Sequence, residues 1–213
     1  MRTIMLLNAK GGCGKSTLAS NLASHYAGQG KQVALVDHDP QASSLEWLAA
    51  RPDSAAPITG IDATAEGARI PRGTEIAIHD VPAGIKDREL TAMVRRAETL
   101  IIPVLPSPID IRAASRFIGE LLLVGKVSRK QTKLAVVANR VRENTLVYHR
   151  LEKFLNSLKI PFVATLRDTQ NYIRAEERGL GIFELPPSLV AHDLEQWEPL
   201  LRWLRSKRSR PQA

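Results

Sequence analysis

Short apolar runs alternate along the chain with longer segments in which apolar residues recur at helical spacing. The short runs predict strands and the longer segments predict helices. We expect strands at residues 3–7, 32–36, 75–78, 100–104, 133–138 and 161–164. We expect helices at residues 16–27, 43–49, 87–96, 111–124, 145–158, 171–178 and 192–205.

This alternation predicts an α/β fold, a mostly parallel, twisted sheet with helices on both faces, because strands buried on both sides read as continuous apolar runs. Residues 51–73 lack a clear period and contain scattered Pro and Gly, so we expect a loop with short elements there. The length of 213 residues suits one domain, which we place at residues 1–205. Residues 206–213 carry basic side chains and no acid, which predicts a mobile basic tail.

Composition narrows the class of protein and of partner. No apolar run approaches the roughly 20 residues that a membrane-spanning helix needs. A single cysteine excludes an internal disulfide, which fits a cytoplasmic location. The net charge of +8 favours a polyanionic partner, either nucleic acid or an acidic membrane surface, although a merely soluble basic protein would carry the same charge.

The most specific signal follows the first apolar run, and it reads Lys10-Gly11-Gly12-Cys13-Gly14-Lys15-Ser16-Thr17. Its glycines let the backbone curl so that successive N–H groups point at phosphate oxygens. Lys15 can reach the β- and γ-phosphates, and the Ser16 hydroxyl can ligate Mg²⁺. The helix that begins here adds its positive N-terminal dipole. The octet therefore predicts a phosphate-binding loop.

A second lysine distinguishes this loop from the common template, which has Gly where this chain has Ala9. One triphosphate does not need two lysines, so Lys10 could reach across a dimer interface to a nucleotide held by a partner. Cys13 occupies the variable position, where a small residue is tolerated. The N–H groups and Lys15 around it could also favour a thiolate.

The octet closely resembles the deviant Walker motif of the ParA/MinD family of ATPases. The resemblance implies a P-loop NTPase fold that binds ATP and Mg²⁺. It also implies an ATP-dependent sandwich homodimer in which Lys10 of each chain reaches the opposite nucleotide. Lys10 and Lys15 would then take part in slow ATP hydrolysis.

Carboxylates follow two of the predicted strands, Asp37 and Asp39 after one and Asp80 after the next. Acids so close to a triphosphate would repel it unless a metal intervenes or they handle water. Asp80 looks like the family's Walker B acid, and Asp37 looks like a second acid near the metal. The Asp39-Pro40-Gln41 segment resembles the ParA switch I, where Asp39 would orient or deprotonate the attacking water. Turn or helix-capping roles remain open for all three acids.

Two polar residues after later strands resemble a base-binding site. Asn139 matches the family's adenine-reading position, since an amide can both donate to and accept from a purine edge. A capping role is the alternative for Asn139. Asp168, in the loop after the next strand, could close over the base. The proline-rich segment at residues 100–110 resembles the family's strand and turn that lead into an interface helix.

The resemblance further implies non-specific DNA binding by the ATP-bound dimer, which needs phosphate contacts only. Arg174 and Arg178 are spaced to share one face of the expected helix, and a solvated basic face is the alternative. The further candidate cations in the later half are Arg142, Arg167, Arg140, Arg150, Lys153, Lys126, Arg129 and Lys130.

These observations predict a cytoplasmic, nucleoid-associated ParA-type ATPase that positions a plasmid, a chromosome or a protein microcompartment or cluster. A ParB-like or cargo-adaptor protein would stimulate hydrolysis. One alternative is a MinD-like regulator on a membrane surface, because Trp197, Leu200, Leu201 and Leu204 form an apolar stripe on the last expected helix. Such a stripe more often packs on its own domain, so we do not expect a membrane partner. A P-loop enzyme acting on a small molecule is the third class.

Overall fold

The computed structural model describes residues 1–85, 87–123, 132–142, 145–158 and 160–211. A parallel sheet of seven strands forms its centre, in the order β3-β2-β4-β1-β5-β6-β7. The strands are β1 (Arg2–Leu6), β2 (Val33–Asp37), β3 (Thr59–Asp62), β4 (Ile76–Asp80), β5 (Thr99–Val104), β6 (Lys133–Val141) and β7 (Phe162–Arg167). This arrangement confirms the predicted parallel α/β fold.

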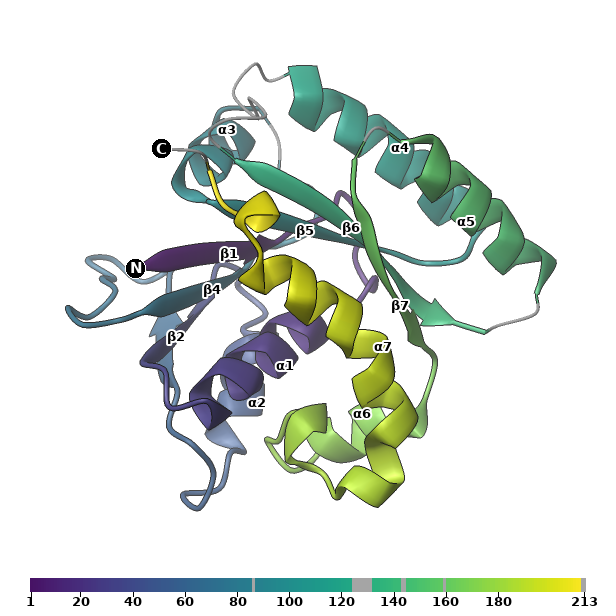
Figure 1. The fold of residues 1–213 in the computed structure, drawn as a ribbon. Coiled ribbons are helices and arrows are strands. Elements are labelled where there is room, and N and C mark those ends of the chain that lie inside the picture. The colour runs from purple at the N-terminus through teal and green to yellow at the C-terminus, as the bar shows by residue number, and fades with distance from the viewer. Residues whose placement is uncertain (86, 124–131, 143–144, 159, 212–213) are drawn as a thin grey trace.

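Helices cover both faces of this sheet (Figure 1). They are α1 (Lys15–Gly28), α2 (Ser43–Ala49), α3 (Asp87–Arg96), α4 (Pro108–Leu123), α5 (Leu146–Ser157), α6 (Gln170–Glu176) and α7 (Pro187–Arg205). Alternate residues of β1 serve the two sides, since Ile4 packs with α1 and α7 while Met5 packs with α3, α4 and α5. Both faces of the central strand are therefore buried, which explains its continuous apolar sequence.

Most elements differ from their predicted bounds by one or more residues, among them β3, α7 and α6. The short edge strand β3 lies in the segment predicted as a loop, where only its Ile61 is buried. Helix α7 begins at Pro187 rather than at residue 192. Helix α6 ends at Glu176, so Arg178 lies in the turn beyond it. Gly179 follows at φ 60°, and a Cβ there would lie 2.3 Å from the Arg51 backbone nitrogen.

The last described residues are packed on the domain, which differs from the mobile tail that the charge pattern predicts. A 3-10 helix covers Lys207–Ser209. Arg2 Nη2 donates to the buried Ser209 hydroxyl at 2.7 Å, and the Thr99 hydroxyl donates to the Ser209 carbonyl at 2.6 Å. These hydrogen bonds join the C-terminal residues to β1 and β5.

The apolar stripe of α7 is part of the core, because Trp197, Leu200, Leu201 and Leu204 are all buried. The stripe therefore packs on its own domain and does not face outward toward a lipid surface. No helix among the described residues is long and apolar enough to cross a membrane.

Candidate functional site

The predicted site residues converge at one edge of the sheet. The strands are parallel, so their carboxyl ends meet there, and the register pairs Asp80 of β4 with both Leu6 of β1 and Asp37 of β2. The phosphate-binding loop joins β1 to α1 at the same edge. The loop and the two acids therefore lie together, as ligand sites of open parallel sheets do.

Gly14 shows why the loop needs glycine. Its φ of +91° disfavours other residues, and a Cβ there would lie 2.2 Å from Asn139 Nδ2. That amide donates to the Cys13 carbonyl at 2.8 Å. The loop is consequently held in its curled shape by a side chain from β6.

The side chains of Lys15 and Cys13, both part of this loop, are buried. Lys15 Nζ donates to the Lys10 carbonyl at 3.5 Å, and Cys13 Sγ lies 3.4 Å from the same oxygen. Burial raises the pKa of the Cys13 thiol, although the charge of Lys15 lowers it in part. The raised pKa disfavours the thiolate alternative, and the burial of Cys13 agrees with the expectation of a small, tolerated residue.

Asp37 and Asp80 share a partner that the sequence analysis missed. The Ser44 hydroxyl donates to Asp80 Oδ2 at 2.6 Å, and the Ser44 backbone N–H donates to Asp37 Oδ2 at 3.0 Å. Ser44 lies in the first turn of α2. The serine pair that opens this helix after Asp39-Pro40-Gln41 was the available signal.

The electrostatics of the two acids favour a cation. Both are almost completely buried, and burial raises the pKa of Asp80, against hydrogen bonds from Ser16 and Ser44. Asp37 raises the pKa of Asp80 further by charge repulsion. Oxygen atoms of Ser16, Asp37 and Asp80 fit the preference of Mg²⁺ for oxygen ligands. No cluster of three or more His, Cys, Asp or Glu side chains that could hold a metal occurs in the described part of the chain.

Asp39 lies at the rim of this cluster and is half-buried. Its Oδ1 accepts from the Gln41 backbone N–H at 3.0 Å, and its own N–H donates to Asp37 Oδ1 at 2.9 Å. The turn-closing role that the sequence left open is thus present. The water-handling role of Asp39 stays a prediction.

A small pocket beside the loop brings the two candidate base-binding residues together. It has a volume of about 170 Å³, and Asn139, Asp168 and Thr17 all line it. Tyr172 and Ile173 of α6 supply apolar surface on the same pocket. The position next to the start of α1 suits a purine whose phosphates occupy the loop.

Two of the predicted DNA-contacting arginines form ion pairs, and the other two are exposed. Arg142 pairs with Asp168 at 3.1 Å, and Arg167 pairs with the buried Asp193 at 2.5 Å. Arg174 and Arg178 are exposed, but α6 ends before Arg178, so the expected shared helix face is wrong. The candidate cations Lys126, Arg129 and Lys130 lie outside the described residues.

Lys10 is held on the α4 side of the loop. Its Nζ lies 3.4 Å from Asp110 Oδ1, in the first turn of α4. The proline-rich segment connects β5 to this helix, which begins at Pro108 rather than at residue 111. The sequence pointed to the segment but not to Asp110.

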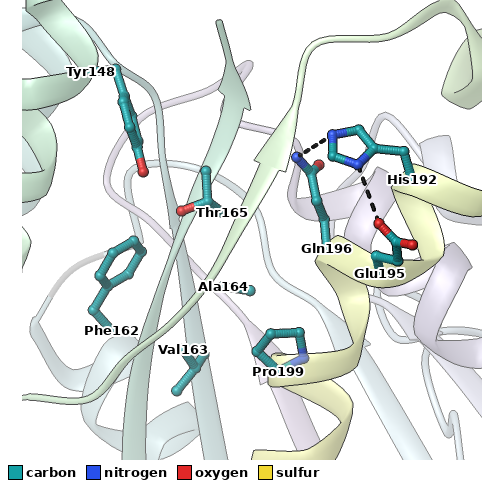
Figure 2. Close-up of a pocket in the computed structure, with 9 residues that line it drawn as sticks. All are labelled: Tyr148, Phe162, Val163, Ala164, Thr165, His192, Glu195, Gln196 and Pro199. Atoms are coloured by element: carbon teal, nitrogen blue, oxygen red, sulfur yellow. Dashed lines mark hydrogen bonds and ion pairs between the residues drawn. The ribbon is translucent and has the colours of Figure 1, made fainter. Parts of the chain in front are cut away.

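A larger groove lies apart from the loop and the acids (Figure 2). Its volume is about 420 Å³, and it runs along the outermost strand, β7, with Tyr148 of α5 on one side and α7 on the other. His192 and Gln196 of α7 form a polar wall there. No residue of the phosphate-binding octet lines this groove, so it belongs to no part of the nucleotide site.

Comparison with known proteins agrees with this geometry. The family model described as the CobQ/CobB/MinD/ParA nucleotide binding domain matches residues 4–182. A protein from Gloeobacter kilaueensis named maintenance of carboxysome distribution protein A is 31% identical over 192 residues, 86% of this chain and 84% of that protein. A protein of the same name from Halothiobacillus neapolitanus is 26% identical over 190 residues, 86% of this chain and 87% of that protein.

Two solved structures show the same fold. Apo McdA from Cyanothece superimposes with a TM-score of 0.70 at 16% identity, over 96% of this chain and 99% of that one. The MinD cell division protein of Aquifex aeolicus superimposes with a TM-score of 0.69 at 20% identity, over 96% of both chains. The agreement therefore extends across nearly the whole chain.

Proposed function

The chain belongs to the CobQ/CobB/MinD/ParA nucleotide-binding family as a P-loop ATPase of the ParA/MinD type, and we propose that it hydrolyses ATP to position a cargo on DNA. The observation that carries this proposal is the second lysine, Lys10, at the start of a phosphate-binding loop that has Ala9 where the common template has Gly. A loop serving one nucleotide has no use for it. A lysine offered to a second chain's nucleotide makes dimerisation depend on ATP.

Within one chain, each residue of the site has a task. The loop N–H groups and Lys15 hold the phosphates, and the dipole of α1 adds to them. Mg²⁺ held near Ser16, Asp37 and Asp80 would neutralise charge on the β- and γ-phosphates. Asn139 and Asp168 contact the base, and Asp39 orients the attacking water at the rim.

Dimerisation supplies the remaining group. Lys10 of the partner would add a cation to the γ-phosphate, where a charge given in trans can accelerate transfer by about 10³–10⁵. The surface around Lys10 suits such a contact, because Ile109 is 60% exposed beside Asp110. An exposed large apolar side chain next to the site favours burial against another chain.

We further propose DNA and an adaptor protein as the dimer's partners. The net charge of +8 supports non-specific contacts with phosphates. Two relatives are named for carboxysome distribution, which favours a protein compartment or a comparable assembly as the cargo. The membrane-surface alternative receives no support from α7, whose apolar stripe is buried.

Fluorescence anisotropy on two unrelated DNA duplexes, each over a salt series, tests the DNA proposal. The protein with Mg²⁺ and ATP should bind both sequences alike, and more tightly than with ADP. The log–log salt slope should be about −0.9 for each phosphate neutralised. Changing Arg174 and Arg178 to Glu should flatten that slope, and the same charge change at the exposed Arg69 and Arg72 should affect it less. Absence of DNA binding at low salt would overturn the DNA role.

A further inference from the structure

The two carboxylate oxygens of Asp110, the acid that contacts Lys10, have different partners. Asp110 is the third residue of α4, and its backbone N–H donates a hydrogen bond to the Ser107 hydroxyl oxygen at 3.1 Å. The Ser107 hydroxyl in turn donates to Asp110 Oδ2. The other carboxylate oxygen, Oδ1, faces Lys10 Nζ at 3.4 Å. One oxygen therefore serves the helix cap, and the other serves the lysine.

The two side chains of this ion pair differ in burial and in mobility. The Asp110 side chain is only 12% exposed, whereas that of Lys10 is 38% exposed. A carboxylate in the first turn of a helix is stabilised by the helix dipole, so Asp110 is the fixed partner. Lys10 is a flexible chain that precedes Gly11 and Gly12, and it can leave without disturbing α4.

We propose that Asp110 is a positioning residue for Lys10, holding it within its own chain until an ATP-bound partner takes it. This inference rests on the proposed role of Lys10 in trans. Lys10 cannot reach an opposite nucleotide while it stays on Asp110, so each chain must give up this ion pair when the sandwich forms. The ion pair thereby disfavours the dimer unless the γ-phosphate of the partner's nucleotide replaces Asp110. It also keeps Lys10 on the surface that would face the partner.

The size of the effect follows from the exposure of the pair. Ion pairs at partly exposed positions change an equilibrium by about two- to fivefold. A sandwich dimer breaks two of them, one in each chain, and the factors multiply. Asp110→Asn keeps an oxygen for Ser107 but removes the charge, so it should tighten the ATP-dependent dimer by about 4- to 25-fold.

Zero-length carbodiimide cross-linking followed by peptide mass spectrometry tests the contact on the full chain. This reagent joins a lysine amine to a carboxylate only when the two touch. The nucleotide-free protein should yield a Lys10–Asp110 cross-link, and Mg²⁺ with ATP should deplete it. The exposed Lys31–Glu75 pair, at 2.9 Å, is the matched internal control and should not respond to nucleotide. Mixing isotope-labelled and unlabelled chains shows whether a link lies within one chain.

A second measurement distinguishes failure of this inference from failure of the proposed function on which it rests. Sedimentation with Mg²⁺ and ATP should show a tighter dimer for Asp110→Asn than for wild type, while Glu75→Gln leaves dimerisation unchanged. If wild type dimerises with ATP but the Lys10–Asp110 link never forms or persists undiminished, the positioning role is wrong and the proposed function survives. An Asp110→Asn dimer no tighter than wild type also overturns the positioning role. If wild type never dimerises with ATP, the proposed function itself fails.

Discussion

Replacing Gly14 by Ala tests how the phosphate-binding loop is held before any nucleotide arrives. The new Cβ would sit 2.2 Å from Asn139 Nδ2, far inside contact distance, and would force the backbone to keep a φ of +91°. The Asn139 amide would have to move, and its hydrogen bond to the Cys13 carbonyl would break. Gly12 offers a matched control, since its φ is +73° and its Cβ would meet nothing within 4 Å.

Two effects should lower the free energy of unfolding in these variants. A left-handed conformation costs a residue with a Cβ about 1–2 kcal/mol, and this part applies to both glycines. Displacing the amide leaves buried polar groups unpaired, which costs about 1–3 kcal/mol and applies only to Gly14. Gly12→Ala should therefore destabilise the chain by about 1–2 kcal/mol, and Gly14→Ala by about 2–5 kcal/mol.

Urea unfolding of the nucleotide-free protein measures both costs. The difference between the two variants isolates the contact with Asn139. In an Asn139→Ala background the clash is gone, so the cost of Gly14→Ala should fall to that of Gly12→Ala. If Gly14→Ala and Gly12→Ala agree within about 0.5 kcal/mol in the wild-type background, Asn139 does not brace the loop.

Three further predictions concern the acids and a buried histidine. Asp39→Ala should slow phosphate release by about 10²–10⁴ and leave a trapped ATP-bound dimer, whereas a wild-type rate would remove Asp39 from catalysis. Asp80→Asn should raise the Tm of the nucleotide-free protein in calorimetry, because burial raises the pKa of Asp80 and disfavours its charge, yet it should weaken the stabilisation by Mg²⁺ and ATP. Burial lowers the pKa of His79 from 6.5 to about 3. Below pH 6.5 the unfolded chain therefore binds a proton that the folded chain does not bind. As the pH falls, the free energy of unfolding should decrease by up to about 1.4 kcal/mol per pH unit. Urea unfolding at pH 7.5 and 5 should show a smaller loss for His79→Gln, and an equal loss would contradict this origin.

The sequence was most informative where one local rule decides the structure. Helix α2 has the predicted bounds, and the six predicted strands agree within a few residues because most of them are buried on both faces and read as apolar runs. β3 was missed because it is an edge strand with a single buried residue. Its pairing with β2 depends on the sheet and not on its own pattern.

Some residues of the site could likewise be predicted from the sequence, and others could not. The octet, Asp37 and Asp80 could be predicted because the spacing of the loop and the ends of parallel strands bring them together. The roles of Ser44 and Asp110 could not, since each depends on a contact between segments far apart in the chain. The helix dipole and burial that make Asp110 a fixed partner appear only once α4 is placed.

Sedimentation velocity of three proteins with Mg²⁺ and ATP tests the central claim, that Lys10 serves the nucleotide of a second chain. Wild type should form a dimer with ATP and remain a monomer with ADP. Lys15→Ala should neither bind ATP nor dimerise, because the phosphates lose their main cation. Lys10→Ala should bind ATP and stay a monomer, and a Lys10→Ala protein that dimerises with ATP as wild type does would contradict the account.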